Sequence, residues 1–532
     1  MPLRFKGSRD WKPDKSKDAA AAAPAQEEAD GQALSGDLAS DLATFKSCFD
    51  RLSDMVFREI RLAGPRKAAL IYLDGMCDVG RIDTDILKAL LQESTGQALK
   101  DAPVDAMLGR IDEQIVHAAQ TTKDRLIGSI ADHILGGKTA LLLDGVKEAL
   151  LIGTQKWESR SIDESPSEPV IRGPRDGFTE NIRTNTSLIR RRLKDKNVKM
   201  EAMQTGRISK TQIVLVYVEG IADPKLVDEV KARIKRVDID AVLESGYLEE
   251  LIEDSPLTIF PQIMNTERPD RVAGLVLEGK VGILVDNTPF ALVVPVTMFD
   301  LLEASEDYYQ RFIPSTVTRW LRLWLAFSAL VFPSLYIAIT AFHQEMLPTS
   351  LLLSIAASRE AVPFPAIVEA FLMELAFEGL REAGVRLPRP VGQAVSIVGA
   401  LVIGQAAVQA GIVSATLVIV VSFTGIASFI FPAYSLGVAV RLLRFPLMII
   451  AGTMGLYGIL LALLALLIHL AGLRSFGVPY LSPVSPLRAS ELKDVLIRAP
   501  WWAMWWRPME TARMNPNRMK RGLRPRKPER KG

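Results

Sequence analysis

The sequence predicts a multi-domain chain in which an α/β region of two repeated lobes precedes an α-helical, polytopic membrane domain of four to six helices. Three observations support this prediction. A strand-and-turn pattern occurs twice before Tyr309, and long uncharged apolar runs occur only after Trp320. The mean hydropathy is +0.17 although 23% of the residues are charged, so apolar and polar residues must be segregated along the chain.

Composition excludes several classes of protein. A chain of 532 residues is too long for one ordinary soluble domain. Its net charge of +3 excludes a polyelectrolyte. Two cysteines, Cys48 and Cys77, exclude a disulfide framework or a multi-cysteine metal cluster. The four histidines lack HxxxH or HExxH spacing, which argues against a zinc hydrolase. We therefore expect no cofactor and no metal.

Residues 1–45 are predicted to form a disordered arm, because they are rich in Ala, Asp and Glu. The first lobe is expected to span 46–155. It would begin with a helical stretch over Asp41–Leu62, which overlaps the arm, and continue with an apolar strand over Ala68–Leu73. No apolar core of a signal peptide is present near Met1, so we expect this region to stay in the cytoplasm.

An internal repeat organises the first half of the chain and predicts a second lobe over 196–305. The stretch 70–78 matches 215–223 at an offset of 145, and 137–144 matches 279–286 at an offset of 142. The following strand keeps that second offset, with 149–152 against 291–294. A chance match of common strand-turn patterns is the alternative. Duplication is favoured because order and spacing are kept, and it would give two lobes with a cleft between them.

A polar linker is predicted over 156–195, between the lobes, and a short second linker over 306–318. The first contains turn-forming Gly-Pro and Asp-Gly pairs. Its arginines could clamp an anion or pair with a partner's carboxylates, or they could be solvated and pair locally. The candidate residues for contact with another subunit are Arg172, Gly173, Pro174, Arg175, Asp176, Gly177 and Phe178.

The membrane domain is predicted over 319–473. A span needs about 20 apolar residues, and four uncharged stretches satisfy this: Leu323–Gln344, Val391–Gly411, Val413–Tyr434 and Phe445–Leu473. Small residues recur every fourth position in the second stretch and predict close helix packing; they are Gly392, Ser396, Ala400 and Gly404.

A further helix is predicted over Pro363–Gly384, and it carries Glu369, Glu374 and Glu378 in an apolar context. Carboxylates in such segments are costly and often mark ion routes, so these three are candidate ion-pathway residues. Rings of acidic side chains from several subunits would select cations. The alternative is an interfacial amphipathic helix with solvated glutamates.

The sequence is compatible with two different numbers of membrane crossings. If the acidic helix spans the membrane, there are five crossings and the tail ends outside; if it is interfacial, the tail is inside. Residues 474–532 form a basic tail whose tryptophans suggest a position on the membrane surface, and 512–532 are expected to be disordered. Attraction of this end to anionic lipid is simpler than nucleic-acid binding, which we do not expect. His469, at a span end, is expected to be interfacial.

Several long strings resemble the A subunit of GerA-type spore germinant receptors, over roughly 50–486. They include Arg172–Phe178 within 161–181, and the segments 255–262, 362–365, 377–388, 397–404 and 477–480. The resemblance implies a multi-pass protein of the spore inner membrane that acts with a polytopic B subunit and a lipoprotein C subunit. It also implies a homo-oligomer that forms a nutrient-gated cation channel, with small-nutrient specificity expected to rest mainly on the B subunit.

Four function classes can be compared on the residues. A channel-forming receptor subunit predicts a homo-oligomer and ion conductance. A secondary transporter predicts inverted repeats among the spans, and none is visible in the sequence. A non-conducting sensor subunit stays open. An enzyme would need a nucleophile–base pair or a metal cluster, and the sequence reveals neither.

Overall fold

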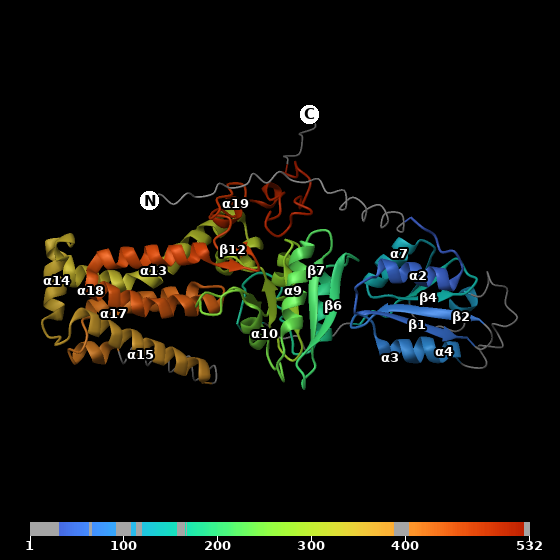
Figure 1. The fold of residues 1–532 in the computed structure, drawn as a ribbon, viewed down its shortest axis with the longest axis horizontal. Helices are drawn as coiled ribbons and strands as arrows, with labels where there is room; N and C mark the ends of the chain where they lie inside the picture. The colour runs from blue at the N-terminus through green and yellow to red at the C-terminus, as the bar shows by residue number, and fades with distance from the viewer. Residues whose placement is uncertain are drawn as a thin grey trace, which may run out of the picture. The chain divides into compact units, whose positions relative to one another are not determined.

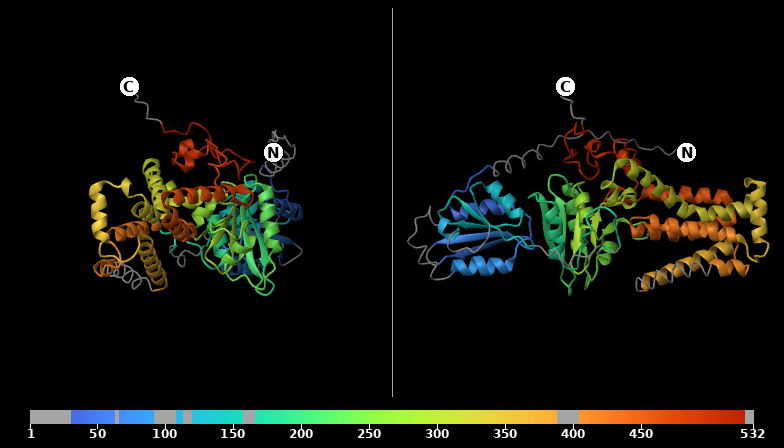
Figure 2. Two further views of the ribbon diagram at one scale, coloured as in Figure 1. Left: turned by 60° about the vertical axis from the view of Figure 1, so that its left-hand side comes forward. Right: turned by 180° about the vertical axis from the view of Figure 1, so that it is seen from behind.

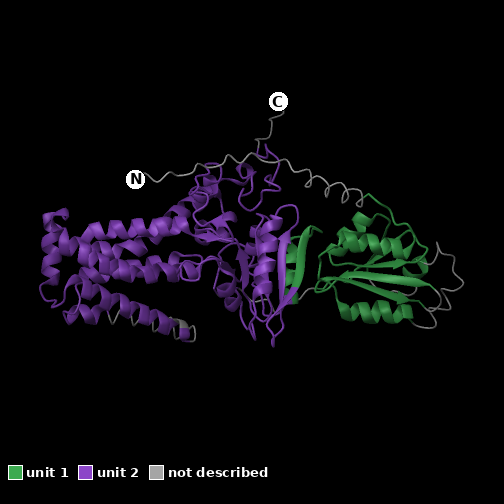
Figure 3. Cartoon of the chain, viewed as in Figure 1, with its two compact units in different colours: residues 1–161, 183–202 green, residues 162–182, 203–532 purple. Residues whose placement is uncertain are grey.

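The computed structural model describes residues 31–62, 66–91, 108–112, 120–156, 165, 167–387 and 404–525, and Figure 1 shows their elements. The chain divides into two compact units (Figure 3). The first comprises Met1–Ser161 with Arg183–Ala202, and the second comprises Ile162–Ile182 with Met203–Gly532.

The first unit is built on a five-stranded antiparallel sheet with the strand order β1-β2-β4-β5-β3. Helices α2 and α7 cover one face, and α3, η2 and α4 cover the other (Figure 1). The bounds are α2 Leu38–Cys48, β1 Met55–Arg61, β2 Lys67–Leu73, α3 Val79–Arg81, η2 Ile82–Leu87, α4 Lys88–Leu91, β3 Thr121–Asp124, α7 Ile127–Leu135, β4 Thr139–Leu143 and β5 Ala149–Ile152.

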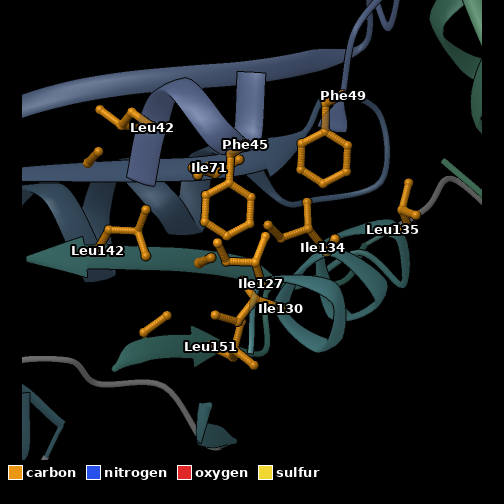
Figure 4. Close-up of a cluster of buried hydrophobic side chains, with 14 of the residues drawn as sticks. Leu42, Phe45, Phe49, Ile71, Ile127, Ile130, Ile134, Leu135, Leu142 and Leu151 are labelled. Atoms are coloured by element: carbon orange, nitrogen blue, oxygen red, sulfur yellow. The ribbon is translucent and has the colours of Figure 1, made fainter. Parts of the chain in front are cut away.

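The side chains of the central strand β2 alternate between the two faces of the sheet and contribute to two separate cores. Ile71 packs with Phe45 of α2 and Ile130 of α7 in one cluster of buried side chains (Figure 4). Leu70, its neighbour in the strand, packs with Ile86 of η2 in a separate cluster. Successive strand residues point to opposite faces, so an uninterrupted apolar strand lies between two helical layers.

The second unit contains a sheet with the equivalent order β6-β7-β9-β10-β8. Helices α9 and α10 share a buried cluster with β7, β9 and β10. The bounds are β6 Val198–Thr205, β7 Thr211–Val218, α9 Pro224–Arg236, α10 Ser245–Ile252, β8 Met264–Thr266, α11 Pro269–Val276, β9 Val281–Val285, β10 Ala291–Val294 and α12 Met298–Leu302. All but the first residue of helix α8, Ile182–Arg192, and the first part of β6 fall in the chain range of the first unit.

The pairing registers repeat together with the strand order. Ala68 of β2 pairs with Leu143 of β4, and Ile213 of β7 pairs with Val285 of β9. These pairs are related by the same offsets of 145 and 142 that the sequence strings have. The turn glycines after β2 and β7, Gly75 and Gly220, have φ of 81° and 79°. The predicted internal repeat is confirmed at the level of sheet topology.

The second unit continues into a helical bundle and then a tail. Among the residues that the structure describes, two helices are long and apolar enough to cross a membrane, Phe312–Phe342 and Tyr434–Gly472. Helix α14 lies across one end of the bundle (Figures 1 and 2). The bounds are η4 Ser305–Tyr308, α13 Phe312–Phe342, η5 Gln344–Met346, α14 Thr349–Arg359, α15 Ala366–Arg386, α17 Ala415–Ala427, η6 Ser428–Ile430, α18 Tyr434–Gly472, β11 Arg474–Ser475, β12 Val478–Pro479, α19 Leu492–Val495 and η7 Trp501–Ala503.

Helix α18 reverses direction at Gly455, which has φ 62° and ψ −145°. A Cβ on Gly458 would lie 2.9 Å from the carbonyl oxygen of Ile450, although eight residues of a continuous helix would span about 12 Å. The backbone N–H of Leu456 donates to Nε2 of His343 at 3.3 Å, so the new helix starts against the end of α13. The prediction of one helix over Phe445–Leu473 is therefore wrong, because the turn lies inside an uncharged run.

The N-terminal predictions also need correction. The predicted arm over 1–45 ends too late, because α2 begins at Leu38 and buries Leu42 and Phe45 in the first core. The predicted helix over Asp41–Leu62 ends at Cys48, and its second half is strand β1. Strand pairing with the apolar β2 outweighs helix propensity there.

The C-terminal tail packs on the second sheet region. Oγ of Ser475 donates to the carbonyl oxygen of Gln262 at 2.6 Å, and the hydroxyl of Tyr480 donates to that of Pro261 at 2.9 Å. Arg518 contacts Glu278. The predicted disorder of 512–532 is therefore wrong for the stretch around Arg518, and 526–532 lie outside the described residues.

Candidate functional site

Helix α15 carries the three glutamates singled out in the sequence. It begins at Ala366, directly after Pro365, which occupies the N-cap position. Proline is tolerated at a helix start because the first N–H groups have no helical acceptor. The predicted helix over Pro363–Gly384 is confirmed as a helix, and each of the three glutamates meets an arginine from elsewhere in the bundle.

Glu369 lies in the first turn of α15 and is fully buried. Its Oε1 accepts from Nε of Arg359, the last residue of α14, at 3.2 Å, and lies 3.1 Å from Nη2. Its Oε2 accepts from the backbone N–H of Ser414, the N-cap of α17, at 3.1 Å. This carboxylate therefore joins α14, α15 and α17.

Glu374 forms the most enclosed of the three ion pairs of α15. Its Oε2 lies 2.5 Å from Nη1 of Arg444 on α18, and both side chains are buried. Its Oε1 accepts from Oγ1 of Thr424 on α17 at 3.3 Å. Nε of Arg444 donates to the carbonyl oxygen of Ala329 on α13 at 2.9 Å. One charged pair thus contacts four helices.

Glu378 lies one turn further along α15 and is 39% exposed. Its Oε1 lies 3.2 Å from Nε of Arg441, one turn before Arg444 on α18. Arg381 follows on α15 and donates to Oγ of Ser428 at 2.6 Å. This end of the acidic helix is therefore polar and partly open, whereas the Glu374 end is closed.

The geometry has a direct electrostatic consequence. A buried carboxylate needs a compensating charge, and each glutamate has one in the described arrangement. The described arrangement therefore pairs all three carboxylates. A cation at Glu369 or Glu374 would have to replace the guanidinium of Arg359 or Arg444, whereas Glu378 stays 39% exposed beside its arginine.

The predicted linker motif packs on its own unit. Phe178 is buried, and its N–H donates to the carbonyl oxygen of Glu267 at 2.7 Å. The carbonyl oxygen of Pro174 accepts from Arg268 at 2.9 Å. Gly173 has φ 141°, and a Cβ there would lie 2.7 Å from the ring of Tyr309, just before α13.

The N–H of Arg172 donates to Glu306 at 3.3 Å, which places the start of the motif beside η4. Contact of Arg172, Gly173, Pro174, Arg175, Asp176, Gly177 and Phe178 with another subunit stays a prediction. The predicted linker range of 156–195 also includes helix α8, in which Leu188 and Ile189 are buried.

Comparison with known proteins decides the family. The family model described as "Bacillus/Clostridium GerA spore germination protein" matches residues 43–510. This chain belongs to the GerA family. The match covers both sheets, the helical bundle and most of the tail.

Curated relatives match the GerA-family chain over most of their own length. Spore germination protein KA of Bacillus subtilis is 45% identical over 92% of this chain and 90% of its own. The uncharacterized membrane protein YfkQ of the same organism is 45% identical over 91% and 93%. A crystal structure of the N-terminal domain of the A subunit of the Bacillus megaterium spore germinant receptor GerK3 is 34% identical, covers 49% of this chain and 96% of its own, and has a TM-score of 0.40.

The small-residue stripe of this GerA-family chain is only partly described. Gly392, Ser396 and Ala400 lie outside the described residues. Gly404 is described, and a Cβ there would lie 3.6 Å from the side chain of Val418 on α17. Close packing by the whole stripe therefore stays a prediction. Within the described part of the chain, no group of three or more His, Cys, Asp or Glu is placed to hold a metal ion.

Sequence reasoning missed a buried charge cluster where α13 begins. By the positive-inside rule, the sequence positions of Arg319 and Arg322 indicate only the cytoplasmic entrance of a span. In the structure both are buried, and Asp307 accepts from Nη1 of Arg322 at 2.9 Å and from Nε of Arg319 at 3.2 Å. Asp494 of α19 lies 3.3 Å from Arg319. The arginine spacing was the available signal, but the acidic partners are distant in sequence.

This cluster predicts a pH dependence for docking of the tail. Burial raises the pKa of Glu303 to about 8, against the opposing effect of Arg319, which lies 3.3 Å away. Glu303 accepts from the hydroxyl of Tyr308, which also contacts Asp494. A carboxyl with a raised folded-state pKa stabilises the fold fully below its unfolded value of about 4.3. That stabilisation is lost as the pH rises through about 8.

We therefore expect proteolysis of the tail near Asp494 to accelerate as the pH rises towards about 8 and to level off above it, with the rate measured relative to an unstructured peptide. Glu303→Gln should flatten the upper part of the profile, since it removes the group with the higher pKa, while Asp494, whose pKa burial raises to about 6, still titrates at lower pH. Asp238→Asn is the control, because hydrogen bonding to Arg207 lowers the pKa of Asp238 and it does not titrate in this range. An unchanged profile in Glu303→Gln would assign the effect to another group.

Proposed function

We propose that this chain is the A subunit of a spore nutrient-germinant receptor, and that it oligomerises in the membrane as a nutrient-gated cation channel. Membership of the GerA family and the names of the spore germination relatives support the first part. The single observation that supports the channel is the acidic helix α15, whose three glutamates lie within the bundle and pair with arginines. Such costly charges are retained where they serve transport or switching.

The proposed mechanism is an exchange of ion pairs. In the closed state the arginines of α14 and α18 neutralise the carboxylates of α15. Nutrient binding in the assembled receptor favours a second arrangement, to the extent that its affinity differs between the two states. If that arrangement moves Arg444 away from Glu374, the carboxylates of several copies face the ion path and select cations.

The proposed localisation is the spore inner membrane, with the N-terminal region on the cytoplasmic side. The contacts of Ser475 and Tyr480 with the second sheet region support a position of the tail on the same side as that sheet. If the sheet before the first crossing and the tail after the last one lie on the same side of the membrane, the chain must cross an even number of times. The reversal at Gly455 adds the crossing that the sequence prediction lacked. A B subunit, a C lipoprotein and a small nutrient, bound through the B subunit, are the proposed partners.

The test is ion flux through liposomes that contain the purified chain, with and without its B and C partners and a panel of nutrients. Nutrient-dependent cation flux that requires this chain would support the channel. An assembled complex that binds nutrient without flux would instead indicate a non-conducting sensor subunit. Flux that depends on a substrate gradient and saturates with it would indicate a secondary transporter.

Glutamine variants locate the path. We expect Glu369→Gln, Glu374→Gln and Glu378→Gln to change cation selectivity or the rate of release, because each removes a carboxylate from the proposed route. Glu382→Gln is the matched control: it lies on the same helix, but its side chain is 63% exposed and pairs with Arg386. Reversal potentials in mixed KCl and NaCl gradients give the selectivity. Unchanged selectivity and rate in all three variants would remove these residues from the pathway.

A further inference from the structure

The loop 255–262, between α10 and β8, presents apolar side chains to the outside of an ordered turn. It carries no charge and has proline at both ends, Pro256 and Pro261. Leu257 is 97% exposed and Ile259 is 44% exposed. A leucine that the fold leaves uncovered forgoes the favourable free energy of burial, so a surface that covers it would gain that free energy.

The loop is held rigidly in spite of this exposure. The side chain of Gln262 accepts from the N–H of Ser255 at 3.0 Å and donates to its carbonyl oxygen at 2.8 Å. Gln262 is buried, and so is Phe260, whose ring contacts that of Tyr480. The amide of Gln262 thus closes the loop from inside, and Leu257 is displayed by a fixed scaffold.

One contact fixes the depth of the loop relative to the membrane helices. Oγ1 of Thr258 lies 2.9 Å from Nε2 of His469, and Phe260 packs against the same imidazole. His469 lies in the last turn of α18. The second part of α18, from Leu456 to Gly472, is about 26 Å long at a rise of about 1.5 Å per residue, slightly less than the ~30 Å hydrocarbon core. His469 therefore lies close to the membrane–water boundary, and Thr258 must lie at the same depth.

The surroundings agree with that depth. Leu464, Leu467 and Ile468 of α18 are exposed apolar residues within the five positions before His469. Trp320 and Trp324 are half-exposed in the N-terminal half of α13, and Nε1 of Trp320 donates to the carbonyl oxygen of Leu496 in the tail. Tryptophans are enriched at membrane interfaces. Arg474, exposed just beyond α18, is placed to meet headgroup phosphates.

We propose that Leu257 and Ile259 insert into the interfacial region of the lipid bilayer on the side of the second sheet. The loop would act as a membrane-surface anchor beside the last spanning segment. This inference rests on the proposed membrane arrangement. The anchor fixes the second sheet region close to the bilayer, next to the helix whose first part carries Arg441 and Arg444, so the lipid surface itself supports the arrangement of those arginines.

The test places a fluorescent probe at single cysteines of the full chain, in a Cys48→Ser background in which Cys77 stays buried. The chain is reconstituted in vesicles of phosphatidylglycerol and phosphatidylethanolamine that carry a nitroxide quencher either shallow or deep in the acyl chain. Leu257→Cys is the test variant. Ile208→Cys, 77% exposed in the β6–β7 turn, is the soluble control, and Leu464→Cys reports the spanning helix.

We expect the probe at 257 to emit at shorter wavelength than the probe at 208, to be quenched several-fold more by shallow than by deep nitroxide, and to be shielded from aqueous iodide. Iodide quenching at 257 without lipid quenching would overturn the anchor, if the probe at 464 is quenched by lipid. Shielding from both quenchers would also overturn it, because protein would then cover the loop. Absence of lipid quenching at 464 would overturn the membrane arrangement and the anchor together.

Discussion

Replacing Arg444 by alanine is expected to lower the free energy of unfolding by about 3–5 kcal/mol. The substitution leaves the carboxylate of Glu374 buried beside Thr424 without its counter-charge. It also removes the donor to the carbonyl oxygen of Ala329. Breaking one side of a buried pair is costly because the remaining ion keeps its desolvation penalty and loses its partner.

Thermal and denaturant unfolding of the full chain in detergent would measure this loss. The exposed pair Glu382–Arg386 on α15 is the matched control, and Arg386→Ala should cost no more than about 0.5 kcal/mol. The double variant Glu374→Met with Arg444→Met should recover most of the stability, since apolar replacement of a whole buried pair is often neutral. Equal losses from Arg444→Ala and Arg386→Ala would show that the Glu374 site is hydrated.

The same variant bears on the channel proposal. If Arg444 keeps cations from Glu374, its removal from a folded receptor should raise nutrient-independent flux. Stability and flux are measured separately. A variant receptor that is less stable but shows no increase in nutrient-independent flux would mean that Arg444 stabilises the fold and does not block the ion path.

The sheets could be predicted from the sequence because their signals are local. An apolar strand that ends at a turn, as in Leu70–Gly75, is recognisable by itself, and its second copy at Leu215–Gly220 supports it. Strand β1 was missed because Met55–Arg61 mixes charged and apolar residues and follows a true helix. Only its pairing with β2 identifies it as a strand, and pairing partners are not visible in an isolated segment.

The sequence predicted the carboxylates of the acidic site but not their arginine partners. The sequence places Glu374 and Glu378 on one helical face, because the period of the helix is fixed. Their partners Arg444 and Arg441 lie more than sixty residues away on another helix, and helix packing alone brings the charges together. The sequence therefore identified the carboxylates, either as ion-pathway residues or as solvated residues of an interfacial helix, whereas the structure pairs each one with an arginine.

Gly455→Ala is expected to have the second large effect, because the reversal of α18 depends on a backbone conformation that only glycine adopts readily. At φ 62° and ψ −145° a side chain is strained, which costs about 1–3 kcal/mol. A Cβ would also lie 3.0 Å from Nε2 of His343 and 3.1 Å from Cβ of Phe342. Moving His343 aside would remove the acceptor for the N–H of Leu456.

The glycine at the end of the same helix gives the comparison. A Cβ on Gly472 would have no atom within 4 Å outside its chain neighbours and its own helix, and the φ of Gly472 is not positive. Gly472→Ala should therefore stay within about 0.5 kcal/mol of the parent. Unfolding in detergent measures both variants, and the lipid-quenching profile of a probe at Leu464 reports whether the second part of α18 keeps its depth. If Gly455→Ala matched Gly472→Ala in both measurements, α18 would tolerate a continuous helix at this point, and the even number of crossings would lose its structural support.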